Sequence, residues 1–401
     1  MNGTSGREGR VTHSLDSFAE QKLAELSASN LRRALTETDR SEGIWIRRDG
    51  RRLLSFSCND YLNLTQHPAV KEAAIAAIRR YGAGAGASRL VTGNHPLFAD
   101  LEARLAGLMG TETACVFGSG YLANSGIVPA LVGKEDLILI DELAHGCLWA
   151  GAQLSRGRIV GFRHNDLAHV EALLDEHRRA HGKAILLTDG VFSQDGDIAP
   201  LEELVALGDR FDTWVMSDDA HGIGVVGQGR GATFATGRDA RVPLKMGTLG
   251  KAVGSYGGYL AASAPVIDLI RNRARTYGLT TGQPPATVAA TIASLEIIAT
   301  DPALVERPLA KAKAFAASLG IPEPQTPIVP IIIGDETATL NASRMLADEG
   351  FFVTAIRPPT VPRGTARLRV LITAGHPDDE IERLATVIRQ RVPRSDAPAG
   401  G

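Results

Sequence analysis

A lysine in a turn of small residues is the first candidate for chemistry. Lys251 lies between a glycine and an alanine, shortly after the extended segment 242–246. Further upstream, the apolar segment 214–217 is typical of a strand that ends at Asp218, and His221 follows soon after. Ligands of open α/β sheets bind outside the carboxyl ends of the strands. We therefore expect this amine, carboxylate and imidazole to meet over one ligand.

This set of side chains suits pyridoxal phosphate (PLP) catalysis. A lysine amine forms a Schiff base with the cofactor aldehyde, and a carboxylate keeps the pyridine nitrogen protonated so that the ring accepts electrons. Each segment alone is more simply a surface lysine in a glycine-rich loop or a solvated pair of aspartates, because short motifs have a high false-positive risk. Their occurrence together, in this order, favours PLP.

The composition indicates a globular protein with a large core. The chain has 401 residues, 44% of them hydrophobic, and a net charge of −2, so neither charge nor any dense basic run suggests nucleic-acid binding. The three cysteines show no metal-ligand or paired spacing, so we expect no metal site and a reducing compartment. The N-terminal residues lack the apolar region of a signal peptide, and no run approaches the roughly 20 apolar residues of a membrane span. We expect a cytoplasmic protein without membrane contact.

Short apolar strands alternate with helical patterns through the middle of the chain. The expected strands are 114–117, 137–140, 159–162, 184–188, 214–217, 244–246 and 258–262. The expected helices are 121–132, 147–155, 167–181 and 200–210. Such alternation predicts an α/β fold with a mostly parallel, seven-stranded-type sheet and helices on both faces.

The two ends of the chain have different patterns. Before the sheet we expect helices at 15–38, 68–81 and 97–109 and a hairpin over 44–56. After it we expect helices at 286–299, 340–349 and 378–391 and strands at 328–333, 352–356 and 368–373. The predicted division is an N-terminal arm (1–60), a large PLP-binding domain (61–285) and a small α+β C-terminal domain (286–401).

Eight sequence blocks together resemble the α-oxoamine synthases, PLP enzymes of aminotransferase fold type I. The blocks are FSCNDYLNL (56–64), GASRLVTGNHPLF (86–98), GSGYLAN (118–124), DELAHGCLWAG (141–151), TDGVFSQDGDIAPL (188–201), DDAHGIGVVG (218–227), GTLGKAVG (247–254) and AIRPPTVPRGTARLRVLITAGH (355–376). The resemblance extends from about residue 31 to residue 391.

The resemblance implies four catalytic groups. Lys251 would carry PLP and, once displaced by the substrate, remove the α-proton. Asp218 would pair with the protonated pyridine nitrogen, although an aspartate at a strand end can also cap a helix. His221 would hydrogen-bond the phenolic oxygen of the cofactor, and His145 would stack on its ring.

It also implies further contacts to the cofactor. Gly120 and Tyr121 would bind the phosphate at a helix N-terminus, where an ordinary tight turn is the plainer reading. Thr248 would donate to the same phosphate, and Ser193 would contact the cofactor near its phenolic oxygen. Thr281 would reach the phosphate of a neighbouring subunit in a homodimer with shared sites, or would simply cap a helix.

Four residues are candidates for substrate binding. Arg369 would hold the carboxylate of the amino acid, since a guanidinium binds carboxylates bidentately. Strand alternation puts Arg367 and Arg369 on the same face, so only the resemblance identifies Arg369, and not Arg367, as the arginine that binds the carboxylate. Asn59 would line the substrate site, Arg32 would lie near the substrate entrance, and Thr360 would belong to a substrate-binding segment, 357–360.

Some residues depart from the family pattern or allow another chemistry. Asp189 stands where many members have glutamate, which leaves room for water-mediated contacts. Asn63 replaces a usual glycine, and Tyr121 a common phenylalanine. Cys147 follows His145 closely, but a Cys–His nucleophile pair is disfavoured because nothing nearby orients the thiol toward the imidazole and no third group is evident.

The implied reaction is a decarboxylative condensation of an amino acid with an acyl thioester. Segment 355–370 is most similar to family members that join L-alanine to a pimeloyl thioester in biotin biosynthesis. The alternatives are glycine C-acetyltransferase and other members of the family, such as 5-aminolevulinate synthase. An aminotransferase or a PLP-fold protein without turnover is disfavoured. Whether coenzyme A or acyl carrier protein carries the acyl group stays open.

Overall fold

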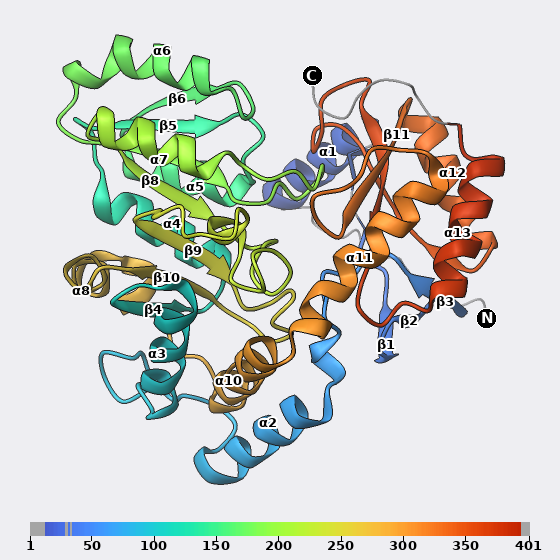
Figure 1. Ribbon diagram of the computed structural model, residues 1–401, viewed down its shortest axis with the longest axis horizontal. Helices are drawn as coiled ribbons and strands as arrows, with labels where there is room; N and C mark the ends of the chain where they lie inside the picture. The colour runs from blue at the N-terminus through green and yellow to red at the C-terminus, as the bar shows by residue number, and fades with distance from the viewer. Residues whose placement is uncertain (1–12, 29–30, 33, 394–401) are drawn as a thin grey trace, which may run out of the picture.

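The computed structural model describes residues 13–28, 31–32 and 34–393. Its larger part is a seven-stranded sheet in the order β4-β10-β9-β8-β7-β5-β6 (Figure 1). β10 is antiparallel to both of its neighbours, and the other paired strands are parallel. The strands are β4 (Thr113–Phe117), β5 (Leu137–Asp141), β6 (Arg158–Phe162), β7 (Ala184–Asp189), β8 (Trp214–Asp218), β9 (Leu244–Thr248) and β10 (Gly258–Ala262).

Helices cover both faces of this sheet because side chains alternate along each strand. Leu139 and Leu186 face one side, and Ile138 and Ile185 face the other; all four are fully buried. The first side packs on α3 (Leu97–Met109), α6 (Leu167–His177), α7 (Leu201–Arg210) and α10 (Pro285–Thr300). The second side packs on α4 (Gly120–Leu131), α5 (Gly146–Ser155), α8 (Ala264–Arg273) and α9 (Arg275–Gly278). The near-continuous apolar strands fit a sheet that is covered on both faces.

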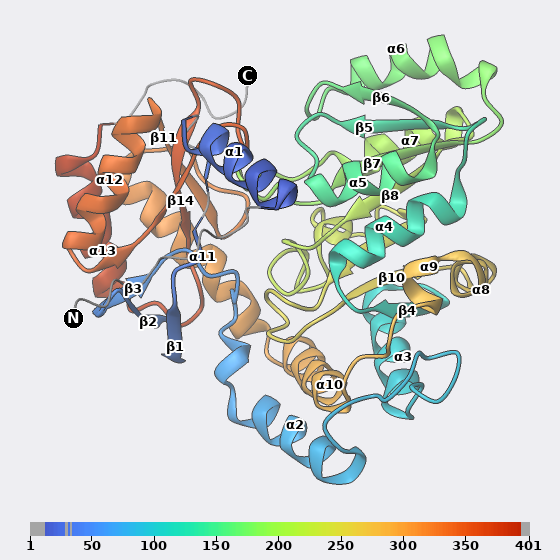
Figure 2. The same ribbon diagram turned by 180° about the vertical axis from the view of Figure 1, so that it is seen from behind.

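Two smaller sheets lie beside the large one (Figures 1 and 2). One contains β1 (Thr38–Glu42), β2 (Trp45–Arg48), β3 (Arg51–Ser55) and β12 (Phe351–Phe352). The other, the three-stranded sheet, contains β11 (Ile328–Gly334), β14 (Ala366–Leu371) and β13 (Thr354–Ile356). Around them lie α11 (Pro302–Leu319), α12 (Glu336–Asp348) and α13 (Asp378–Arg391), which share a third buried cluster with β3, β11 and β14.

The predicted α/β class and its mostly parallel seven-stranded sheet are confirmed. The hairpin expected over 44–56, which is β2 and β3, and the helix α2 (Pro68–Tyr81) also form as predicted. The division into domains stays a prediction. α10 packs against α2 and α3 beside the large sheet, and α11 leads from there to the smaller sheets (Figure 2).

Several predicted elements have wrong boundaries, among them the helix expected over 340–349, which begins at Glu336, and the strand expected over 368–373, which is Ala366–Leu371. The helix expected over 15–38 is α1 (Ser14–Ala28); the N–H groups of Leu31 and Arg32 bond back to Leu26, and β1 begins at Thr38. The strand expected over 352–356 is divided between two sheets, because Phe352 pairs with β3 and Thr354 pairs with β14. The helix expected over 167–181 ends in a 3₁₀ turn, Arg178–Ala180.

α8, α9 and α11 lie where the pattern predicts no element. In α11, Pro302 stands in the first turn, where a helix tolerates proline, but Pro308 lies inside the helix, where proline is disfavoured. Within the described ranges, no single helix is long and apolar enough to cross a membrane; α10 and α11 pass that test only as a pair bent by 78°.

Candidate active site

Five strand ends of the large sheet open onto one cavity of about 200 Å³. The segments that follow β4, β5, β7, β8 and β9 line it, at the carboxyl edge where α/β sheets bind ligands. Eight of the predicted residues lie together here: Gly120, Tyr121, His145, Ser193, Asp218, His221, Thr248 and Lys251. The arrangement of parallel strands therefore brings together side chains that are far apart in the sequence.

Lys251 belongs to the turn that follows β9. Its carbonyl accepts a hydrogen bond from the Gly254 N–H, which closes the turn and directs the side chain to the cavity. Burial lowers the pKa of the Lys251 amine to about 8, and the charges of Asp218 and Asp189 only partly oppose this effect. The amine is therefore neutral in a useful fraction of molecules near neutral pH.

Asp218 is held at the end of β8 by two N–H donors and, at 3.7 Å, by the Cys147 thiol. Its Oδ2 accepts from the Asn124 Nδ2 at 2.7 Å, and its Oδ1 accepts from the Ala220 N–H at 3.0 Å. On the neighbouring strand, Asp189 pairs in register with Asp218. Burial and the charge of Asp218 raise the pKa of Asp189 well above its usual value. Asp189 makes a direct contact, accepting from the His145 N–H at 3.0 Å.

His221 is a buried, neutral imidazole. Burial, with the nearby Lys251 and Arg369 charges, holds its pKa well below the usual value. The Tyr61 Oη lies 2.8 Å from its Nδ1, and burial raises the pKa of that phenol. When this phenol donates to Nδ1, the imidazole proton is on Nε2, which is the tautomer that can donate to a ligand. His221 is thus prepared to donate a hydrogen bond from Nε2.

His145 and Cys147 lie closer together than the sequence led us to expect. The His145 Nδ1 is 2.8 Å from the Cys147 Sγ, so the expectation that nothing orients this pair is wrong. α5 begins at this point, and its first turn brings the two side chains to the same side. Burial and the charge of Asp218 raise the pKa of the Cys147 thiol to about 12, while burial lowers the pKa of His145. Both effects oppose a thiolate–imidazolium pair, so this is not an activated nucleophile.

The N-terminus of α4 forms the other end of the cavity. Ser119 caps this helix by accepting from the Leu122 N–H, and the N–H groups of Gly120 and Tyr121 precede it in the first turn. A Cβ on Gly258 would lie 2.7 Å from the Ser119 carbonyl, so the close approach of this turn to β10 requires glycine. The Thr248 hydroxyl donates to the Gly257 carbonyl at 2.8 Å and would have to turn to donate to a ligand.

The substrate-binding candidates are partly brought together. The Arg369 Nη2 donates to the Asn59 Oδ1 at 3.0 Å, which joins β14 to the segment after β3. Thr360 and Arg32 are exposed and do not line the cavity. Thr281 also lies outside it and forms an isolated β-bridge with Ser88.

Two residues that support the site are not among those predicted. Asn124 is fully buried in α4, and Tyr61 is fully buried in the segment that also contains Asn59. An asparagine within an otherwise apolar helix was the available signal for Asn124. Nothing in the sequence pairs Tyr61 with His221, because only the fold brings these distant segments together.

This set of groups fits PLP. Asp218 is an almost fully buried carboxylate that makes no ion pair among the described residues, so the protonated pyridine nitrogen suits it. The N-terminus of α4 suits the phosphate. Lys251 provides the amine for the aldehyde, and the His221 Nε2 provides a donor for the phenolic oxygen.

Comparisons with known proteins agree with this geometry. The sequence model of the aminotransferase class I and II family matches residues 51–388. An 8-amino-7-oxononanoate synthase of Methylocella silvestris is 65% identical over 347 residues, covering 86% of this chain and 99% of the relative. An 8-amino-7-oxononanoate synthase of Beijerinckia indica is 59% identical over 381 residues, covering 95% of this chain and 99% of the relative.

Among solved structures, a serine palmitoyltransferase from S. paucimobilis with a bound PLP–myriocin aldimine is similar. It superposes with a TM-score of 0.86 at 28% identity, covering 94% of this chain and 98% of that one.

Proposed function

Since this chain belongs to the aminotransferase class I and II family, we propose that it is a PLP-dependent acyltransferase that condenses L-alanine with a pimeloyl thioester to 8-amino-7-oxononanoate. This is a step of biotin biosynthesis. The observation that carries the proposal is the convergence of Lys251, Asp218 and His221 on one cavity, in a chain 65% identical to a relative of that name.

The residues of the cavity support a role toward each part of the cofactor. Gly120 and Tyr121 would bind the phosphate through the N-terminus of α4. Asp218, oriented by Asn124, would pair with the protonated ring nitrogen. Bound in this way, PLP supplies an electron-accepting ring that stabilises negative charge on the α-carbon of the amino acid.

The remaining groups move a proton and orient the substrate. The neutral Lys251 Nζ takes the α-proton of alanine and later returns a proton to the product. The Arg369 guanidinium, steadied by Asn59, holds the alanine carboxylate. The α-carbon then bonds to the thioester carbonyl, the thiol leaves, and the alanine carboxylate departs as carbon dioxide.

The pimeloyl chain has a distant carboxylate that requires a cation or polar group. α1 (Ser14–Ala28) projects between the large sheet and the three-stranded sheet in Figures 1 and 2, and Arg32 follows this helix in the sequence. Arg32 is exposed, which suits an entrance to the site. Thr360, exposed in the segment between β13 and β14, is a second candidate. Both roles are proposals.

The test compares kcat/KM for pimeloyl-, succinyl- and acetyl-CoA, each with L-alanine and with glycine, while carbon dioxide release is measured. Pimeloyl-CoA with alanine should give the highest value. One methylene is worth only about 1–3 kcal/mol in an apolar pocket, so near homologues should react more slowly but measurably. If acetyl-CoA with glycine gives the highest value, the protein is a glycine C-acetyltransferase instead.

A homodimer with shared sites is part of the proposal. Thr281 lies outside the cavity and bridges to Ser88, and the chain near these two residues carries exposed apolar side chains: Leu90 is 65% exposed and Leu279 is 75% exposed. None of the described residues of α1 is buried, although Leu15 and Phe18 lie on it. A second copy would cover such apolar surface. Thr281 would then reach the phosphate in the neighbouring subunit. A fully active monomer in dilute sedimentation runs would contradict this arrangement, and the cytoplasmic location also stays a prediction.

A further inference from the structure

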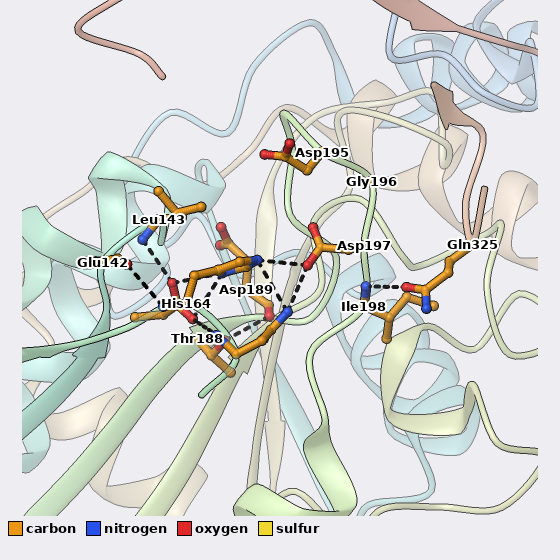
Figure 3. Close-up of polar contacts among 12 residues, drawn as sticks. Glu142, Leu143, His164, Thr188, Asp189, Asp195, Gly196, Asp197, Ile198 and Gln325 are labelled. Atoms are coloured by element: carbon orange, nitrogen blue, oxygen red, sulfur yellow. Dashed lines mark hydrogen bonds and ion pairs between the residues drawn. The ribbon is translucent and has the colours of Figure 1, made fainter. Parts of the chain in front are cut away.

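A histidine outside the cavity bridges two carboxylates. The His164 Nδ1 lies 3.1 Å from the Asp141 Oδ1. Its Nε2 lies 2.8 Å from the Asp197 Oδ2, and Figure 3 shows these two side chains pointing toward each other. Carboxylates only accept hydrogen bonds when ionised, so both ring nitrogens donate and the ring is an imidazolium. Burial alone would lower the pKa of His164, but hydrogen bonds to Asp141 and Asp197 outweigh it and raise the pKa to about 10.

The two carboxylates belong to different parts of the molecule. Asp141 is the fully buried last residue of β5. Asp197 belongs to the segment 190–199, called here the hairpin, which folds back on itself through a bridge between Val191 and Ile198. The Asn165 side chain also donates to the Asp197 Oδ2, at 2.7 Å. The large sheet thus holds one flank of the hairpin through charged hydrogen bonds.

The hairpin is also fastened to the three-stranded sheet. Asp195 at its tip makes an ion pair with the buried Arg367 of β14. The Ile198 N–H donates to the Gln325 Oε1 at 2.8 Å, as Figure 3 shows, and the Thr326 hydroxyl donates to the Gly196 carbonyl at 2.8 Å. A Cβ on Gly196 would lie 2.6 Å from the Ile328 carbonyl, so the two parts are in close contact.

Two functional residues depend on where the hairpin lies. Ser193 is part of it and lines the cofactor cavity. Arg369 follows Arg367 on the same face of β14, so the ion pair at the hairpin tip also sets the distance between Arg369 and the large sheet.

We propose that His164 is a positioning residue: by joining Asp141 to Asp197 it fixes the hairpin, and through it Ser193 at the cofactor and Arg369 at the substrate carboxylate. The inference rests on the proposed function, which gives Ser193 and Arg369 their ligands. The edge of the His164 ring also packs on Phe192 of the hairpin, with centroids 4.3 Å apart.

The test uses His164→Gln in the holoenzyme, with His181→Gln as the matched control. The His181 Nδ1 bonds to the His177 carbonyl just before β7, at the amino end of that strand and not at its carboxyl end, where the hairpin lies. The same chemical change at His181 therefore leaves the hairpin untouched. Amide hydrogen exchange should become about tenfold faster or more in segment 190–199 of His164→Gln only. The KM for alanine should rise about tenfold, with a smaller change in kcat, because a displaced Arg369 binds the carboxylate less well.

A second variant keeps the test decisive if His164→Gln does not fold. Asp197→Asn leaves the pair of His164 and Asp141 intact and should reproduce both effects. Unchanged exchange in segment 190–199, faster exchange spread evenly over the chain, or an unchanged KM for alanine would overturn the proposal. The exchange measurement needs no substrate, so an inactive wild-type enzyme would refute the proposed function without deciding the role of His164.

Discussion

The lowered pKa of Lys251 predicts how fast the cofactor-free protein captures PLP. Only a neutral amine attacks the aldehyde. Because the pKa of the Lys251 amine is about 8 instead of the ordinary 10.5, the fraction of neutral amine rises as the pH passes through 8 and not through 10.5. At pH 7.5 about a quarter of the molecules have a neutral amine, against about one in a thousand for an unperturbed lysine. The ratio corresponds to a capture rate about 200-fold higher.

The assay is stopped-flow absorbance of PLP mixed with cofactor-free protein between pH 6 and pH 10. The logarithm of the rate should rise with pH and level off near pH 8. Arg369→Gln should move this midpoint upward, because the Arg369 charge is one of the influences that lower the pKa of Lys251. A rate that keeps rising to pH 10 in the wild-type protein would refute the reasoning.

Three further changes have definite expected outcomes. Lys251→Ala should fold but form no borohydride-trappable PLP adduct, and a trapped adduct on another lysine would contradict the assignment. Asp218→Asn should bind PLP yet lose about 100-fold or more in kcat/KM, because a neutral ring accepts electrons poorly; activity near wild type would argue against it. Phe315→Ala removes a buried ring of the third cluster and should lower the free energy of unfolding by about 3–5 kcal/mol in a denaturant titration, whereas a negligible loss would contradict its core role.

The local patterns of the sequence were enough for most elements of the fold. The apolar run 137–140 predicts a strand because its residues are all apolar, as in a sheet that is covered on both faces. The turn at Asp49–Gly50 predicts the hairpin of β2 and β3, because both residues adopt the left-handed backbone that such a turn requires. The recognisable blocks around Lys251 and Asp218 likewise identified the cofactor chemistry. α11 was missed because Pro308 obscures its pattern.

The partners of the site residues depend on tertiary structure. Asn124 donates to Asp218, and Tyr61 meets His221, across long stretches of chain. The insertion of antiparallel β10 between β4 and β9 is likewise a non-local pairing.

The sequence by itself therefore determined which groups this protein carries and what chemistry they suit, because side-chain type and short-range periodicity are local properties. Only the tertiary structure decided how these groups are held. The sequence around His164 does not indicate its role. His164 becomes a bridging cation only in the folded protein, where the ends of β5 and β6 meet segment 190–199 after β7. The physical reason is that strand order and the packing of sheet on sheet arise from contacts between distant segments, which no local pattern encodes.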